Sequence, residues 1–168
     1  MMVYISGKIG VEVITPEIRE KFARAEEMLK AKGFEVFNPT DERWQRTLRR
    51  EYEGDKYVKS PLLTGEFPDF YTYCLLRDQM VISTKDAVYF LEDFRDSDGA
   101  TSEYYFAKAI GKNLMFQTYG HAELRLSETY DRLVRKGMPP LQREEGESDY
   151  ALLRRYIELN INSVWLPL

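Results

Sequence analysis

Two β-prone runs with a helical pattern between them constrain the fold more than any other feature of this chain. Val-Tyr-Ile-Ser at residues 3–6 is followed by Gly7, and Phe-Glu-Val-Phe at residues 34–37 is halted by Asn38-Pro39. Runs of this composition that end at glycine or proline are typical of short buried strands. Because strand, helix and strand fit within the first 40 residues, we expect two parallel strands joined by a crossover helix. The sequence therefore predicts an α/β fold with a parallel sheet.

The helix between these runs has clear start and stop signals. Thr15 is predicted to be its N-cap, with Pro16 at the first helical position and Glu17 behind it. Gly33 is expected to end the helix. The apolar residues that recur at helical spacing, and so predict the buried face, are Ile18, Phe22, Ala25 and Leu29.

The remaining elements alternate along a single predicted domain, residues 1–168. Helices are predicted over about residues 41–52, 69–83, 100–110, 121–136 and 148–161, and strands over 86–91 and 113–117. Residues 53–68 have no clear periodicity and predict a long loop. The predicted fold is a flavodoxin-like or Rossmann-like three-layer sandwich, with a core over about residues 2–117, an insertion over about 41–68 and a C-terminal helical extension over about 121–168.

Composition restricts the partners of the chain. The formal net charge of −4 provides no basic field for a nucleic acid polymer, so a small-molecule ligand fits better. The single cysteine, Cys74, has no partner for an internal disulfide, and the lone His121 leaves a Cys/His metal site without ligands. No apolar run has the length of a signal peptide or a membrane span. We therefore expect a cytoplasmic protein without a membrane partner.

Ligands of open parallel sheets bind beyond the carboxyl ends of the strands, which directs attention to two loops. The first, Ser6-Gly7-Lys8-Ile9-Gly10, follows the first strand. Its glycines allow close backbone approach, and Ser6 and Lys8 are suited to a phosphate or a sugar hydroxyl. A tight turn with a solvated lysine explains the same residues.

The second loop leads into the helix that carries Glu103. Polar residues crowd its start, and Glu103 is expected in the first helical turn, where the helix dipole favours an ionised carboxylate. Such a carboxylate can attack the anomeric carbon of a sugar. The alternative is structural: Glu103 stabilises its helix, with Asp98 as the cap.

Asp78 is a third candidate, because it interrupts a fairly apolar helix before the third predicted strand. A surface position is the simpler explanation. A carboxyl group pointing into the cleft, however, could protonate a departing base while Glu103 attacks.

In order, three stretches of the chain resemble the nucleoside 2-deoxyribosyltransferase superfamily: VYISGKIG, AEEMLKAKGFEVFNP and RDQMVISTKDAVYFLEDFRDSDGATSEYYFAKAIGKNLMF. The similarity is greatest to the small phage and bacterial branch, a domain of unknown function, with the pattern YISGP, G-x-x-VFNP and GA-x-x-E. It covers about residues 2–117, apart from the stretch 41–68.

The resemblance implies a function and a set of site residues. The expected reaction is cleavage or transfer of an N-glycosidic bond in a small-molecule nucleoside or nucleotide, with no metal or organic cofactor. Glu103 falls on the nucleophile of the family and Asp78 on the aspartate that handles the leaving base. Tyr4, Ser6 and Gly7 fall on positions that cradle the sugar and any 5′ group, and Ser97 and Ser102 on loop positions that hold a 5′-phosphate. Asp96 and Asp98 are candidates for the acid that precedes the loop glycine, here Gly99, and Lys8 stays a candidate from the chemistry of its own loop. Relatives complete this site with residues from a neighbouring subunit. The resemblance therefore implies a possible homo-oligomer, in which residues 162–166 could contribute to the site.

Departures from the family pattern leave alternatives open. Lys8 stands where the branch often has proline, and Tyr104-Tyr105 follow Glu103 where small residues are frequent. A non-catalytic nucleotide-binding module would keep the cleft and use Glu103 only to hold a ribose hydroxyl. An assembly protein that uses the aromatic surface is a third interpretation. Tyr4, Tyr71 and Tyr73 could stack on a base, although core packing explains each of them as well.

Overall fold

The computed structural model describes residues 1–10, 13–54 and 69–118, and separate residues and short stretches between 120 and 155. Most of the predicted loop, residues 55–68, lies outside the described residues. The same holds for residues 162–166 and for much of the two predicted C-terminal helices. The predictions for these segments therefore stay predictions.

Four parallel strands form the sheet, as the sequence predicts. They are β1 (Met2–Ser6), β2 (Glu35–Phe37), β3 (Ala87–Phe90) and β4 (Asn113–Phe116), and they lie in the order β2-β1-β3-β4. The chain moves from β1 outward to β2 and then returns to the other side of β1 with β3. This reversal is the flavodoxin-like order and creates a switch point between β1 and β3.

The carboxyl ends of the strands meet at one edge of the sheet. Ser6 of β1 pairs with Phe90 of β3, which pairs with Phe116 of β4. The Leu91 backbone N–H then donates to the Ser6 carbonyl over 2.8 Å. The loops that follow β1 and β3 consequently start side by side.

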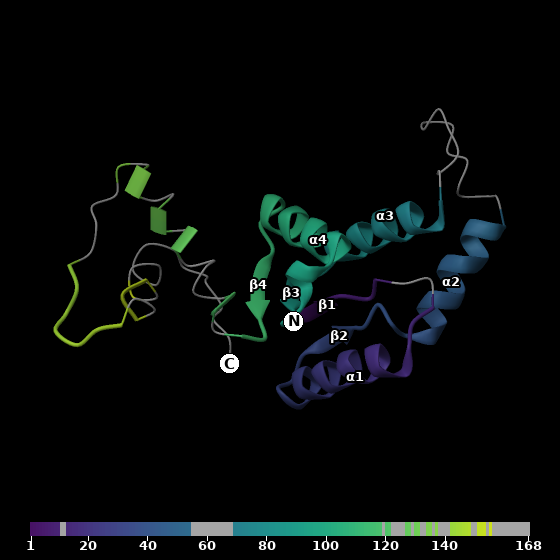
Figure 1. Cartoon of the computed structure of the whole chain (residues 1–168), viewed down its shortest axis with the longest axis horizontal. Coiled ribbons are helices and arrows are strands. Elements are labelled where there is room, and N and C mark those ends of the chain that lie inside the picture. Colours follow the sequence, from purple (N-terminus) through teal and green to yellow (C-terminus); the bar gives the residue numbers. More distant parts are fainter. Residues whose placement is uncertain are drawn as a thin grey trace.

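Helices cover both faces of the sheet (Figure 1). α1 (Pro16–Ala31) packs on one face, whereas α3 (Phe70–Ser83) and α4 (Asp98–Ala109) pack on the other. α2 (Glu42–Glu53) packs against α3, and a short 3₁₀ turn, η1 (Phe94–Asp96), precedes α4. Among the described residues, no helix has both the length and the apolar content needed to cross a membrane.

α1 forms as its sequence predicts. The Thr15 hydroxyl accepts a hydrogen bond from the Ile18 N–H over 3.4 Å and so caps the first turn, and Pro16 opens the helix. Phe22 and Leu29 are buried against the sheet, and each side chain contributes about 1.5–3 kcal/mol through burial. Gly33 follows the helix with a φ of +84°, a conformation that glycine adopts without strain.

The alternation of side chains along β1 separates two cores. Val3 and Ile5 pack with α1, while Tyr4 points to the opposite face and packs with α3 and α4. Ser6 is two residues beyond Tyr4 and therefore lies on the same face. This face of β1 brings hydroxyl groups toward α4.

The start of α4 differs from the predicted start. The helix begins at Asp98, two residues earlier than expected, and Ser97 is its N-cap, with its hydroxyl accepting from the Ala100 N–H over 3.3 Å. The prediction that Asp98 caps the helix is therefore wrong. Asp98 is instead the acidic residue of the first turn.

Candidate functional site

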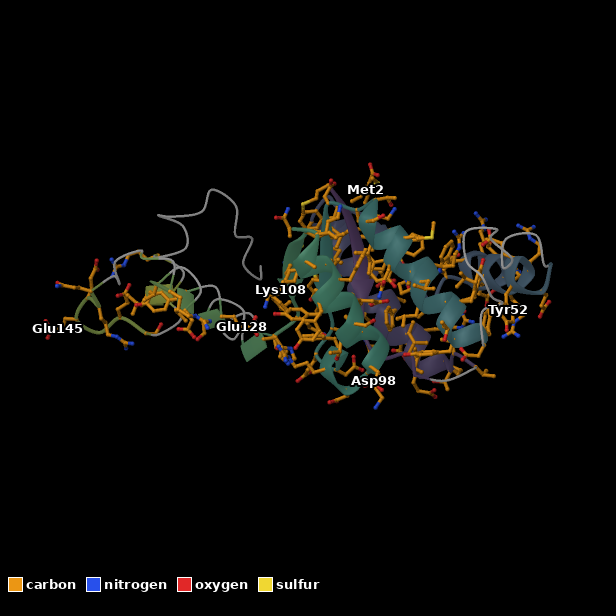
Figure 2. The ribbon with its side chains drawn as sticks, turned by 90° about the horizontal axis from the view of Figure 1, so that it is seen from above. Met2, Tyr52, Asp98, Lys108, Glu128 and Glu145 are labelled. Atoms are coloured by element: carbon orange, nitrogen blue, oxygen red, sulfur yellow. The ribbon has the colours of Figure 1, made fainter. Side chains whose placement is uncertain are left out.

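The switch point between β1 and β3 allows very close backbone approach. A Cβ atom at Gly7 would lie 2.7 Å from Leu91 Cδ1, closer than side chains tolerate. Gly7 is therefore required by packing just after β1. Figure 2 shows Met2, at the start of β1, and Asp98, at the start of α4, at opposite ends of the layered core. The start of α4 thus lies at the carboxyl edge of the sheet.

Tyr4, Ser6 and Glu103 form the centre of the site. The Tyr4 hydroxyl donates to Glu103 Oε1 over 2.9 Å, and the Ser6 hydroxyl donates to Oε2 over 2.5 Å. Each carboxylate oxygen of α4 is thus held by a hydroxyl group from the same face of β1. Tyr4 is 1% exposed and Glu103 is 7% exposed, so these hydrogen bonds lie in a region of low dielectric.

Glu103 does not occupy the helical position that the sequence predicts. α4 begins at Asp98, which places Glu103 in the second turn, beyond the strongest influence of the helix dipole. Burial raises the pKa of Glu103 to about 8, and the charge of Asp78 raises it further, while the hydrogen bonds from Ser6 and Tyr4 oppose the rise. The expectation that the dipole would favour the ionised form is therefore wrong, because desolvation outweighs it.

Asp78 lies in the interior of α3 with a carboxyl group that is partly buried. Its Oδ1 atom accepts a hydrogen bond from the indole Nε1 of Trp44 in α2 over 3.1 Å. Burial raises the pKa of Asp78 to about 7, against the lowering effects of this hydrogen bond and of Arg77. A solvated surface position does not explain such an aspartate.

Asp78 and Glu103 interact electrostatically although they come from different helices. Each carboxylate loses hydration, and the charge of Asp78 raises the pKa of Glu103. Two desolvated acids of this kind favour a state in which the pair keeps one proton. Burial and both carboxylates also raise the pKa of Tyr4 well above its usual range, so its hydroxyl stays protonated as a donor.

A polar contact that the sequence does not reveal holds the loop after β1. Lys21 of α1 donates to the Lys8 carbonyl over 2.8 Å and to Asp93 Oδ2 over 2.5 Å. Asp93 also accepts from the Lys8 N–H over 3.2 Å. These three residues join the loops after β1 and β3 beside the switch point.

Comparison with known proteins now bears on this geometry. A family model described as a domain of unknown function, DUF4406, matches residues 1–116. The chain belongs to the DUF4406 family. A search of curated proteins finds no match. Among solved structures, the chain is similar to a 2-deoxyribosyltransferase from the psychrotolerant bacterium Bacillus psychrosaccharolyticus, with 19% identity, a TM-score of 0.43, and coverage of 69% of this chain and 71% of that chain.

The DUF4406 region contains all four strands of the sheet and the residues of the site, from Tyr4 to Glu103. The family predicted from the sequence motifs, a domain of unknown function, is thereby confirmed. The family model itself names no activity.

Within the DUF4406 region, the structure brings some predicted residues together and leaves others apart. Tyr4 and Ser6 contact Glu103. Lys8 is exposed, as are Asp96 and Asp98. The hydroxyl groups of Ser97 and Ser102 engage the backbone of their own helix, the first as the cap and the second by donating to the Gly99 carbonyl over 2.8 Å.

The aromatic candidates separate in the same way. Tyr73 is buried against Leu48 and donates its hydroxyl to Glu51, which confirms core packing as its role. Tyr71 is 57% exposed. Its hydroxyl oxygen would lie 3.2 Å from a Cβ atom at Gly99, so Tyr71 lies at the start of α4. Tyr104 is buried in an aromatic cluster with Phe90 and Phe94 rather than obstructing the site.

Trp44 and Asp93 contribute to the site although sequence reasoning did not select them. Asp93 stands in the polar loop after β3, so its position relative to the strand could have indicated it. Trp44 falls within the helix predicted over about residues 41–52, and no functional role is predicted for it. Its indole N–H is a donor that needs a partner when buried, and this was the available signal.

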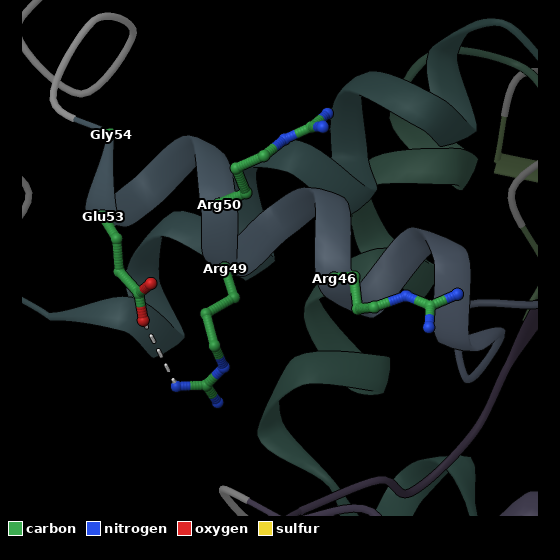
Figure 3. Close-up of a pocket in the computed structure, with 5 residues that line it drawn as sticks. All are labelled: Arg46, Arg49, Arg50, Glu53 and Gly54. Carbon is green, nitrogen blue, oxygen red and sulfur yellow. Dashed lines mark ion pairs between the residues drawn. The ribbon is translucent and has the colours of Figure 1, made fainter.

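Neither a metal cluster nor the surface hollow on α2 adds a binding site among the described residues. The part of the chain that the structure describes contains no group of three or more His, Cys, Asp or Glu side chains that could hold a metal ion. A hollow of about 390 Å³ on α2 is lined by Arg46, Arg49, Arg50, Glu53 and Gly54 (Figure 3). Its arginines point away from one another (Figure 3) and so do not converge on one anion.

Proposed function

We propose that the chain cleaves or transfers the N-glycosidic bond of a nucleoside or nucleotide, with Glu103 as nucleophile and Asp78 as proton donor. The observation that carries this proposal is the pair itself. A buried carboxylate at the carboxyl edge of the sheet, with both oxygens fixed by Tyr4 and Ser6, lies within the electrostatic influence of a second desolvated acid. Glycosidic chemistry uses a pair of carboxyl groups, one as the proton donor and the other as the nucleophile.

The proposed reaction has two steps. A Glu103 carboxylate oxygen attacks the anomeric C1′ atom, the C1′–N bond breaks, and its electron pair leaves with the base. Asp78 donates its proton to the departing base. A second base, or water, then attacks C1′, the bond from C1′ to Glu103 breaks, and the Glu103 carboxylate is regenerated. The proton released by the incoming group returns to Asp78.

The total number of protons on the pair fits these roles. The first step needs an ionised Glu103 and a protonated Asp78, which together hold one proton. Mutual repulsion in a dry site favours this total of one proton. The pKa of Glu103, about 8, lies above that of Asp78, about 7, although two hydroxyl groups donate to Glu103 and one indole to Asp78. The proposed reaction therefore requires the shared proton to move from Glu103 to Asp78 when a substrate binds.

A non-catalytic nucleotide-binding module is a second candidate, and one observation favours it. Both oxygens of Glu103 already accept hydrogen bonds, and the side chain is 7% exposed. A group engaged in this way can fix a binding pocket without reacting. Assembly into a homo-oligomer stays a prediction for either function.

Incubation with a panel of nucleosides and 5′-monophosphates, with and without a second free base, tests the proposal. Chromatography would follow released or exchanged base, and we expect release by the unmodified protein. The Glu103→Ala variant should lose at least about a thousandfold in rate, because the covalent step is then missing. Exchange that requires the second base would identify a transferase, and release into water would identify a hydrolase.

Glu20→Gln is a matched control, because Glu20 is an exposed acid of α1 in an i,i+4 pair with Arg24. It should leave the rate unchanged. Thermal-shift measurements with the same panel identify the second candidate. Stabilisation by a nucleotide without base release, and retained in Glu103→Gln, would establish a binding module and reject the enzyme.

A further inference from the structure

Trp44 of α2 contacts Asp78 directly and is linked to the Glu103 side of the site through Phe37. Its indole N–H donates to Asp78 Oδ1 over 3.1 Å. Its ring meets the ring of Phe37 edge-on, with centroids 5.2 Å apart, and Phe37 stacks on Tyr4 at 5.6 Å. Since Tyr4 holds Glu103, one side chain of α2 supports the surroundings of both acids.

The chemistry of the indole restricts how Asp78 can carry a proton. An indole N–H donates and cannot accept, so the oxygen that it contacts must be an acceptor. Since a carbonyl oxygen is a stronger acceptor than the hydroxyl oxygen of a carboxylic acid, this hydrogen bond favours a proton on Oδ2 over one on Oδ1. The hydroxyl groups on Glu103 impose no such restriction, since each can also accept.

α2 is well fixed to hold the indole in place. Asp41 caps the helix by accepting from the Arg43 and Trp44 N–H groups at 2.8 and 3.2 Å. Leu48 is fully buried on the same side of the helix. The Arg77 guanidinium contacts Glu51 at 2.8 Å and so links α2 to α3 next to Asp78.

We propose that Trp44 is a positioning residue that fixes the Asp78 carboxyl group and presents Oδ2 as the atom that delivers the proton to the leaving base. This role rests on the proposed function, in which Asp78 is the proton donor. Trp44 itself would touch neither the sugar nor the base. Its effect on the reaction passes entirely through Asp78.

The titration of Asp78 depends on every element packed around it. The groups that face it are Arg77 and Cys74 of α3, Trp44 of α2, Tyr4 of β1 and Glu103 of α4. Arg77 favours the ionised form, and Glu103 opposes it. Of the elements outside α3, α2 is the one that donates a hydrogen bond to Asp78 in the described part of the chain.

The indole resonance provides a test that requires no substrate. In ¹⁵N-labelled protein, the Trp44 Nε1–H signal should move with pH as Asp78 titrates, and Trp44→Phe assigns it among the two tryptophans. Asp78→Asn should abolish this movement. A Trp44 signal that does not titrate, or that titrates unchanged in Asp78→Asn, would overturn the proposal.

The pH–rate profile tests the consequence for catalysis. The rate should fall at high pH as Asp78 loses its proton, and Trp44→Phe should move this limb upward by about one pH unit, because a hydrogen bond to the ionised form is lost. Tyr52→Leu is the matched control, because it removes an aromatic ring from the same side of α2. The Tyr52 ring packs on Phe70 and Tyr73. The high-pH limb of the pH–rate profile of this variant should stay at the pH of the unmodified protein.

The two proposals fail in different ways. If the indole signal follows Asp78 but no base is released from any substrate, the proposed function fails while the contact between Trp44 and Asp78 stands. If base is released and Trp44→Phe leaves the profile unchanged, the positioning role is overturned while the enzyme stands. Melting curves of both variants exclude loss of folding as the cause.

Discussion

The inner and outer sides of α2 carry polar groups in different surroundings: the inner side faces the buried carboxylates, and the outer side faces water. On the inner side, Trp44 donates to the partly buried Asp78. On the outer side, Arg46 and Arg50 are exposed, and Arg49 pairs with Glu53 at 3.9 Å (Figure 3). One helix thus contributes to the dry centre of the site and to a solvated charged surface.

The difference teaches that burial, rather than the number of charges, decides where chemistry can develop. Water solvates the outer arginines, so their mutual effects are weak and are screened beyond about 10 Å at physiological salt. Asp78 and Glu103 lose that solvation, which raises the pKa of Asp78 to about 7 and that of Glu103 to about 8. A small number of desolvated groups therefore outweighs the larger charged surface.

The buried acids and the exposed charges of α2 should differ most in how the free energy of unfolding depends on pH. The pKa of Glu103 rises from 4.5 to about 8 on folding, and that of Asp78 from 3.8 to about 7. The folded state then binds more protons than the unfolded state, so the stability from these groups is complete below about pH 4 and is lost as the pH rises through 7 and 8. We expect the free energy of unfolding to fall by a few kcal/mol across this range.

Urea unfolding of the unmodified protein and of Glu103→Gln at pH 5 and pH 8.5 measures this effect. The variant should show a clearly smaller loss of stability at the higher pH. Equal losses in both proteins would mean that Glu103 is solvated as fully as the outer charges of α2, and the contrast would disappear.

Tyr4→Phe has the next largest expected effect. The variant keeps the buried ring but removes one of the two hydroxyl donors to Glu103. At pH 9, where Glu103 is ionised, we expect a loss of about 1.5–3 kcal/mol in the free energy of unfolding, as for other hydrogen bonds to charged groups. The pKa of Glu103 should also rise, which carboxyl NMR can follow.

Tyr105→Phe is the control for this change, because Tyr105 follows Tyr104 on α4 and is exposed. It should alter neither the stability nor the pKa of Glu103. A similar loss in both variants would show that the hydroxyl of Tyr4 contributes no more than a surface hydroxyl.

The smallest expected effect is that of Glu53→Gln on the outer side of α2, which removes the ion pair and leaves Arg49 over the Phe70 ring. The pairing of Glu53 with Arg49 at 3.9 Å is exposed on both partners, so we expect a change below about 0.5 kcal/mol that vanishes in 0.5 M salt. Thermal unfolding at low and high salt measures it. A change above about 1 kcal/mol that persists at high salt would mean that the exposed ion pair contributes as much to the free energy of unfolding as a buried hydrogen bond does.

Much of the fold could be predicted from local pattern. The strand at residues 3–6, the cap at Thr15 and the buried face through Phe22 and Leu29 are all confirmed. These features depend on side-chain spacing along one element, which the sequence carries directly. The start of α4 was less predictable, because Ser97 and Asp98 are equally good capping residues, and in the structure Ser97, directly after the η1 turn, is the cap.

The sequence by itself determined the parallel α/β core, the DUF4406 motifs and the identity of two unusual acids, Asp78 and Glu103. Only the tertiary structure decided their protonation, since the pKa of a carboxyl group depends on the water that it loses and on the charges that approach it. It also decided that Trp44, 34 residues before Asp78, supplies the hydrogen bond to that acid. Contacts of this kind join separate elements across the fold, and no local pattern encodes them.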